Sequence, residues 1–66
     1  MLAVLRAFEG MTQADLAKRA GVDRNTIARI EARRHRPRTL TMVRIAAALG
    51  YDVRRVFPEF NDKAGA

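Results

Sequence analysis

Apolar residues recur along this 66-residue chain at helical spacing, in short runs separated by Gly, Pro and Asp. Such spacing places the apolar side chains on one face of a helix. No stretch alternates apolar and polar residues as a half-buried strand does. The pattern predicts an all-α fold of five helices. Their expected ranges are about 2–8, 13–20, 24 to 32 or 33, 40 or 42 to 49, and 53–57.

Residues with capping chemistry stand at the start of four of these helices. Thr12 and Asp15 have the spacing of a capping box, in which each side chain accepts a hydrogen bond from the other's backbone N–H. The other N-cap candidates are Asp23, Asp52 and either Thr39 or Thr41. Gly10, Gly21 and Gly50 then stop the first, second and fourth runs and Pro58 stops the fifth, because neither residue type continues a helix well.

The inner faces of the helices define the expected core. Its members are Leu5 and Phe8; Leu16, Ala17 and Ala20; Ile27 and Ile30; Met42, Ile45, Ala46 and Leu49; Val53, Val56 and Phe57. A domain of this size buries only about 60% of its unfolded surface, and there is no Cys for a disulfide. Stability therefore depends on helix packing, with dimerisation as a further source.

One domain, residues 1–58, is expected to hold all five helices. Residues 59–66 form a short polar tail that is expected to fray, with only Phe60 able to dock. The apolar start, MLAVL, is interrupted by Arg6, well short of a signal-peptide core or a membrane span. We therefore expect a cytoplasmic protein that does not enter membranes.

The positive charge of the chain is confined to one segment. There are 13 Lys and Arg against 7 Asp and Glu, which gives a net charge of +6. Charges balance in residues 1–23 and again in residues 45–66. The basic segment, residues 24–44, carries seven arginines and one acid, Glu31. A solvated arginine surface does not explain this clustering, whereas a polyanionic partner does, nucleic acid first.

The third helix has two different sides. At about 100° per residue, Ile27 and Ile30 point inward. The outward side chains are Arg24, Asn25, Ala28, Arg29 and Ala32. Alanines allow close approach to another surface, and Arg and Asn form paired hydrogen bonds with guanine and adenine edges. This face favours base reading over an ordinary solvated face.

A short turn containing Gly21 and Val22 joins the second helix to the third. Such a turn holds two helices steeply crossed, and Ala17 is small enough to pack against Ile27 where they meet. In a unit of this kind the second helix rests across the DNA backbone while the third enters the major groove. The pair is therefore predicted to be a helix-turn-helix.

From Met11 to Phe57 the chain resembles the Cro/C1-type helix-turn-helix family, also called the xenobiotic response element family. The matching stretches are TQADLAKRAGVDRNTIARIE, a basic loop containing RPR, and TMVRIAAALGYDVRRVF. The resemblance implies a five-helix, lambda-repressor-like DNA-binding domain. It also implies a transcriptional regulator, most often a repressor, that binds palindromic double-stranded DNA as a homodimer and so associates with the nucleoid.

The resemblance implies roles for single residues. The base-contacting positions match Arg24, Asn25 and Arg29. The positions that contact the DNA backbone match Thr12, Gln13, Thr26, Arg33, Arg34, Arg36 and Arg38. Glu31 matches an acid that pairs with an arginine of the first helix, for which Arg6 is the candidate here.

Two features depart from the family pattern. The family has Gly two residues after that acid, where the helix ends in a left-handed conformation, and this chain has Arg33. Either the third helix continues further or Arg33 adopts a positive φ. The first helix also begins at Met1, so no N-terminal arm is expected to reach a minor groove.

Other functions fit less well. The chain has no Ser or Cys, and His35 has no neighbouring carboxylate, so no enzyme, metal site or cofactor is predicted. No small-molecule ligand is evident, and no aromatic residue lies among the arginines to stack RNA bases. The alternative that remains is an antitoxin-like or anti-repressor-like protein that also binds a protein partner. Its patch, or a dimer contact, would use Tyr51, Val56, Phe57 and Phe60, although core burial is the simpler interpretation of Val56 and Phe57.

Overall fold

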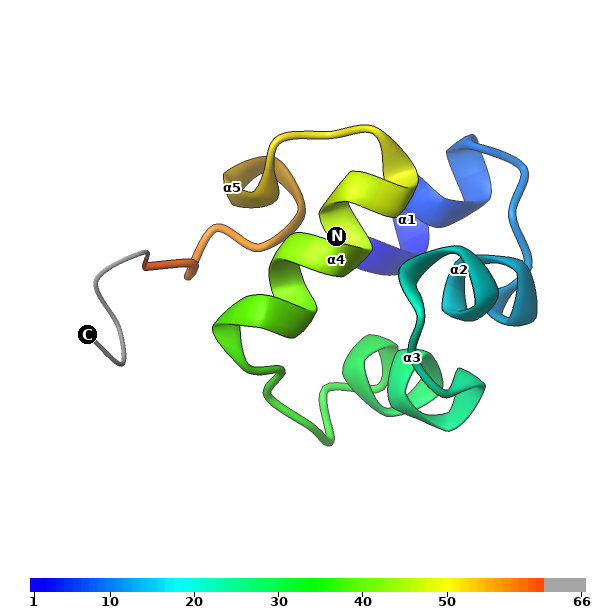
Figure 1. Ribbon diagram of the computed structural model, residues 1–66, viewed down its shortest axis with the longest axis horizontal. Coiled ribbons are helices and arrows are strands. Elements are labelled where there is room, and N and C mark those ends of the chain that lie inside the picture. Colours follow the sequence, from blue (N-terminus) through cyan, green and yellow to red (C-terminus); the bar gives the residue numbers. More distant parts are fainter. Residues whose placement is uncertain (62–66) are drawn as a thin grey trace.

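The computed structural model describes residues 1–61 and consists of short helices joined by tight turns (Figure 1). The helices are α1 (Leu2–Phe8), α2 (Gln13–Ala20), α3 (Arg24–Glu31), α4 (Thr39–Leu49) and α5 (Val53–Val56). No strand occurs in the part of the chain described, and the prediction of an all-α, five-helix fold is confirmed. None of these helices is long and apolar enough to cross a membrane.

One core joins all five elements. In Figure 1, α4 crosses the middle of the molecule, with α5 on one side and α2 and α3 on the other, and α2 packs against both α3 and α4. Leu16 of α2, Ile27 of α3 and Ile45 of α4 are fully enclosed in this core. All the core residues predicted for these three helices are buried, because their 3.6-residue spacing keeps each set on one face.

The prediction for α1 is wrong at one position. Leu5 is buried as expected, but its partner in the core is Leu2, and Phe8 is 81% exposed. Each step of three residues falls about 60° short of a full helical turn. Two steps therefore rotate Phe8 by about 120° away from Leu2, onto the solvent side. The prediction rested on Leu5 and Phe8 alone. That pair could not show whether the core lies on the Leu2 side of Leu5 or on the Phe8 side.

The capping box at the start of α2 is present as predicted. The N–H of Asp15 donates to Thr12 Oγ1 at 2.9 Å, and the N–H of Thr12 donates to Asp15 Oδ2 at 3.0 Å. Asp23 and Asp52 cap α3 and α5 by accepting a hydrogen bond from the N–H two residues later. These local contacts fix the starts of three helices.

The start of α4 differs from the prediction. Its N-cap residue is Arg38, not Thr39 or Thr41, and no side chain caps this end. The carbonyl of Arg38 accepts a hydrogen bond from the N–H of Met42 at 3.0 Å, so Thr39 already lies in the first turn. This register places Met42 in the core.

Four helices end in the same hydrogen-bond pattern around one residue of positive φ. The N–H of that residue donates to the carbonyl three residues back, and the following N–H donates to the carbonyl five residues before it. The residue is Gly10 after α1, Gly21 after α2 and Gly50 after α4. After α3 it is Arg33, with φ of 59°. Helix α3 therefore ends at Glu31, and of the two alternatives for Arg33 the positive φ is the one observed.

The chain beyond α5 folds back onto the core. Val56 and Phe57 are buried, with 2% and 4% of their surface exposed. Phe60 packs against the core, as expected, and its N–H donates to the carbonyl of Phe57 at 2.9 Å. The remainder of the predicted frayed tail, residues 62–66, lies outside the described residues.

Candidate nucleic-acid interface

The outer face of α3 presents polar side chains that the fold does not use. Arg24, Asn25 and Arg29 are exposed, whereas Ile27 and Ile30 on the inner face are buried, as predicted. Within residues 1–61, none of these three polar side chains forms a hydrogen bond or an ion pair. Their donors and acceptors are therefore free for a ligand.

The residues between these polar side chains are small, so little side-chain bulk covers this face of α3. Ala32 is exposed and Ala28 is half-buried, and each carries only a methyl group. Thr26 is half-buried at the margin of the face. The backbone of α3 can therefore come close to a flat surface or a groove, with the longer side chains reaching to either side.

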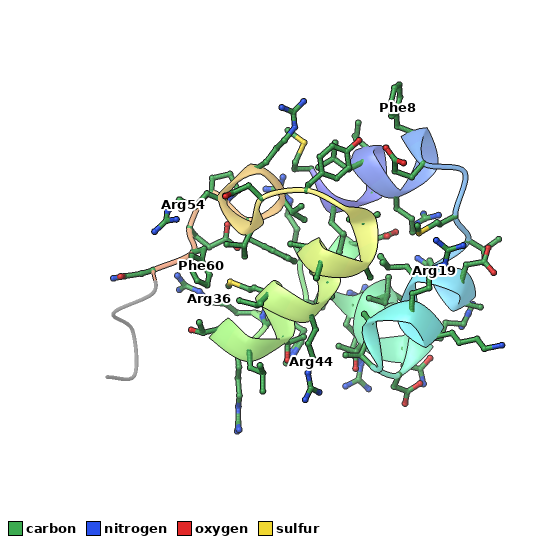
Figure 2. The ribbon with its side chains drawn as sticks, turned by 45° about the horizontal axis from the view of Figure 1, so that its top comes forward. Phe8, Arg19, Arg36, Arg44, Arg54 and Phe60 are labelled. Atoms are coloured by element: carbon green, nitrogen blue, oxygen red, sulfur yellow. The ribbon has the colours of Figure 1, made fainter. Side chains whose placement is uncertain are left out.

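The loop that follows α3 continues the basic surface. Arg33, Arg34, Arg36 and Arg38 are all exposed, and the buried Pro37 fixes the loop to the body of the molecule. Arg44 extends the surface onto α4 and projects outward on the lower side of Figure 2. In the described part of the chain, these five guanidinium groups make no ion pair with an acid.

Glu31, the one acid of the basic segment, is occupied by side chains from other helices. Arg6 of α1 donates from Nε to Oε2 at 2.6 Å and from Nη2 to Oε1 at 3.1 Å. Gln13 of α2 donates from Nε2 to Oε1 at 3.0 Å. The ion pair expected between Arg6 and Glu31 is thus present, and it ties α1, α2 and α3 together. Because Arg6 lies outside the basic segment, Glu31 neutralises none of the seven arginines.

The ionisation of the pair follows from these contacts. Burial alone would raise the pKa of Glu31, but the hydrogen bonds from Arg6 and Gln13 outweigh it and hold the pKa below its ordinary value. The hydrogen bond to Glu31 raises the pKa of Arg6 further above its already high value. Both groups are charged near neutral pH, so the ion pair is formed there.

Gln13 forms a hydrogen bond within the fold and keeps the donor that a phosphate contact would use. It was expected to contact a phosphate, and in this structure it is half-buried and donates to Glu31. The bond uses one of its two amide hydrogens. The second hydrogen and the side-chain oxygen form no bond within residues 1–61. Glu31 therefore orients Gln13 at the N-terminal end of α2.

The apolar patch suggested near the C-terminus does not form as such. Val56 and Phe57 face inward, because the single turn of α5 closes one side of the core. Tyr51 is half-buried and donates from its hydroxyl to the carboxylate of Glu9. The guanidinium of Arg55 lies 5.5 Å from the centre of the Tyr51 ring. Phe60 is covered in the same manner, with the Arg54 guanidinium 5.4 Å from its ring centre.

The large exposed apolar side chains are elsewhere, and sequence reasoning missed them. Val4 and Phe8 lie on α1 with 65% and 81% of their surface exposed. Leu40 and Val43 lie on α4 with 60% and 41% exposed. Each pair is spaced three or four residues apart on the side of its helix that the core does not use, and that spacing was the available signal.

The titratable side chains of residues 1–61 do not gather into a metal site. No group of three or more His, Asp or Glu that could hold an ion is found in this part of the chain. His35 is exposed among the arginines of the loop. The chemistry of the surface is therefore cationic and hydrogen-bonding, which suits phosphate and base edges.

Comparison with known proteins agrees with this geometry. A family model described as helix-turn-helix matches residues 5–56. An uncharacterised HTH-type transcriptional regulator of Methanothermobacter thermautotrophicus is 49% identical over 41 residues, which cover 62% of this chain and 59% of that protein. Another, of Methanocaldococcus jannaschii, is 38% identical over 52 residues, or 79% of each chain. This chain thus spans less than two thirds of the first relative's length.

No solved structure matches the chain. The family match nevertheless runs from α1 to the end of α5 and includes the whole of α2, α3 and α4. It contains the turn at Gly21, the outer face of α3 and the basic loop. The chain belongs to the Cro/C1-type helix-turn-helix family of transcriptional regulators.

Proposed function

We propose that this chain is a sequence-specific regulator that reads double-stranded DNA with the outer face of α3, in the cytoplasm at the nucleoid. The observation that carries the proposal is the state of the basic segment. All seven of its arginines are exposed and none is paired with an acid within residues 1–61. The charge is therefore available to phosphates, and the arginines of α3 are available to base edges.

In this proposal α3 and α2 contact the DNA in different ways. Helix α3 enters the major groove, and α2 lies across the backbone. The side chains that read bases are Arg24, Asn25 and Arg29. Those that hold the backbone are Thr12, Gln13, Thr26, Arg33, Arg34, Arg36 and Arg38. The contacts of Glu31 with Arg6 and Gln13 keep α1 and α2 in place relative to α3.

The protein acts as a homodimer on a palindromic site and represses transcription by occupying it. A single short helix reads few base pairs, whereas two copies place their α3 helices in successive major grooves about 34 Å apart. Leu40 and Val43 support a contact between copies, because they are exposed on the helix that follows the basic loop. Burying them against a second copy removes apolar surface from water.

The test is to select bound sites from random duplex DNA and then to sediment the complex. We expect an enriched palindrome and two chains per site. Enrichment of no motif would contradict sequence-specific reading. A single half-site with one chain bound would contradict the homodimer while leaving DNA reading intact.

A protein partner in addition to DNA is a second candidate function, and one observation favours it. In Figure 2, Phe8 projects from α1 on the side opposite to Arg44, so the α1 face stays uncovered when the basic surface is bound.

Two matched double variants test which of the two apolar surfaces, that of α4 or that of α1, forms the contact between copies. Leu40→Gln with Val43→Gln is expected to abolish two-chain binding to the palindrome. Val4→Gln with Phe8→Gln is expected to preserve it, and the reverse result would assign the dimer contact to α1.

A further inference from the structure

We infer that Arg33 is a position at which this protein gives up folding stability for contact with DNA. The inference rests on the proposed function, because its second half concerns DNA. It goes beyond that function in assigning an opposite effect on stability and on binding to one residue.

The first observation is the backbone of Arg33 compared with the other helix ends. Its φ of 59° is in the same left-handed region as the values of 71° at Gly10, 71° at Gly21 and 84° at Gly50. The hydrogen bonds also correspond. The N–H of Arg33 donates to the carbonyl three residues back at 3.0 Å, and the next N–H donates to the carbonyl five residues before it at 2.9 Å. Arg33 thus occupies a position that this chain elsewhere fills with glycine.

A side chain at such a position is unfavourable. In the left-handed conformation the Cβ atom lies too close to the following carbonyl oxygen, a contact that glycine avoids. Exchange of Arg33 for glycine should therefore stabilise the fold. The opposing effect, the attraction of a cation to the C-terminal end of α3, is smaller than the strain and is also supplied by Arg34.

The second observation is that, in the described part of the chain, the side chain of Arg33 makes no contact that would offset this strain. Arg33 is exposed, and within residues 1–61 its guanidinium forms no hydrogen bond, ion pair or ring contact. Glu59 borders the same open groove as Arg33 and forms no ion pair with it. An intramolecular role would require a partner, and none of these residues supplies one.

The place of the residue indicates the use of its charge. Arg33 follows directly after α3 and stands beside Arg34, so two guanidinium groups lie at the C-terminal end of the helix that reads the bases. A helix in the major groove is flanked by phosphates at this end. The geometry assigns the guanidinium of Arg33 to the DNA backbone, where it contributes charge and no base preference.

The experiment compares Arg33→Gly, Arg33→Ala and Arg33→Lys by thermal melting without DNA and by salt-dependent DNA binding. Arg33→Gly and Arg33→Ala lose the same charge and differ in the strain. We expect the Tm of Arg33→Gly to exceed that of Arg33→Ala by about 4–8 °C. Both are expected to bind every duplex more weakly, with a log–log salt slope shallower by about 0.9 per chain. Arg33→Lys keeps charge and strain, and is expected to match the unsubstituted protein in both measurements.

The outcomes separate the inference from the function on which it rests. Equal melting temperatures for Arg33→Gly and Arg33→Ala would refute the strain. Unchanged affinity and slope in both variants, with normal binding by the unsubstituted protein, would refute the contact and leave the proposed function standing. If the unsubstituted protein binds no duplex at all, the proposed function fails and the inference fails with it.

Discussion

At the scale of the residue, Glu31 controls how the neighbouring arginines are used. It accepts hydrogen bonds from Arg6 and Gln13, and only 8% of its side chain is exposed, against 18% for Arg6. A partly buried pair of this kind contributes more than an exposed one. By holding an arginine from α1, Glu31 leaves the arginines of the basic segment unpaired and fixes the position of the N-terminal end of α2.

Glu31→Ala is expected to lower the free energy of unfolding by about 1–3 kcal/mol, because it leaves both donors without their acceptor. Arg6→Ala is expected to lower it by a similar amount, since it also removes the hydrogen bond from Arg6 Nη1 to the carbonyl of Met11 and leaves Glu31 bonded to Gln13 alone. Chemical denaturation of both variants and of the double variant measures the coupling. Purely additive effects would show that the two side chains do not interact in solution.

The same residue predicts a dependence of stability on pH. The pKa of Glu31 is lowered in the folded protein, so the stability it contributes is fully present above its unfolded value, about 4.3, and is lost as pH falls through the folded pKa. We expect the Tm to fall below about pH 4.3, and to fall less steeply in Glu31→Gln. Asp15, whose pKa is also lowered, leaves that variant some acid sensitivity. If Tm falls with pH equally in the unsubstituted protein and in Glu31→Gln, Glu31 is not the cause of the acid sensitivity.

Variants of two other arginines would distinguish contact with base edges from contact with the DNA backbone. Arg29 is exposed on the outer face of α3, and Arg38 is exposed at the start of α4 beyond the loop. Arg29→Ala is expected to cost about 1–3 kcal/mol on the selected site and to relax preference at one base pair. Arg38→Ala is expected to weaken all duplexes alike and to reduce the salt slope by about 1 per chain. The measurement is binding to the site, to single-base variants and to unrelated DNA, and an exchange of the two profiles would reject α3 as the reading element.

At the scale of the element, the turn between α2 and α3 determines how α3 is oriented relative to α2. Gly21 adopts φ of 71°, and its backbone N–H bonds back to α2. A Cβ atom built at this position meets no atom within 4 Å. The requirement for glycine here is therefore one of backbone conformation and not of space.

Gly21→Ala is accordingly expected to destabilise the protein by about 1–2 kcal/mol through strain alone. Gly21→Asn is the matched control, because Asn tolerates the left-handed conformation better than Ala. This variant is expected to lose less stability than Gly21→Ala. Denaturant titration of both variants provides the comparison. Alanine and asparagine variants of equal stability would place the effect in something other than φ.

At the scale of the whole molecule, the excess positive charge is confined to one part of the chain. The seven arginines of the basic segment occupy α3, the loop and α4, while residues 1–23 and 45–66 balance their charges. The most exposed apolar side chains of α1 lie away from this surface, as Phe8 shows in Figure 2. A molecule built in this way approaches a polyanion in one orientation.

Binding to duplex DNA is therefore expected to weaken steeply as salt is raised. Each phosphate neutralised contributes about −0.9 to the log–log slope. The five arginines of the basic segment that lie outside α3 then account for a slope of about −4.5 per chain. Titration between low and physiological salt measures the slope. A flat dependence would show that the basic segment does not lie along the backbone.

Much of this molecule was already evident in the sequence, because the features concerned are local. Periodicity of 3.6 residues gave the two faces of α3, and glycines and N-cap residues marked most helix boundaries. The charge imbalance of residues 24–44 requires only counting. The pairing of Arg6 with Glu31 joins residues 25 positions apart, and only resemblance to a family suggested it before the structure placed them in contact.

What the tertiary structure decided depends on packing between distant segments. Leu5 and Phe8 alone did not fix which side of α1 faces the core, so Phe8 was placed inside and is exposed. For Val56 and Phe57 core burial was the simpler interpretation and a surface patch the alternative, and the packing of α5 against α4 confirms the core. Arg33 shows the limit most clearly. Its residue type argues against a positive φ, and the hydrogen bonds that end α3 impose one, because the chain must turn there to bring α4 back against α2.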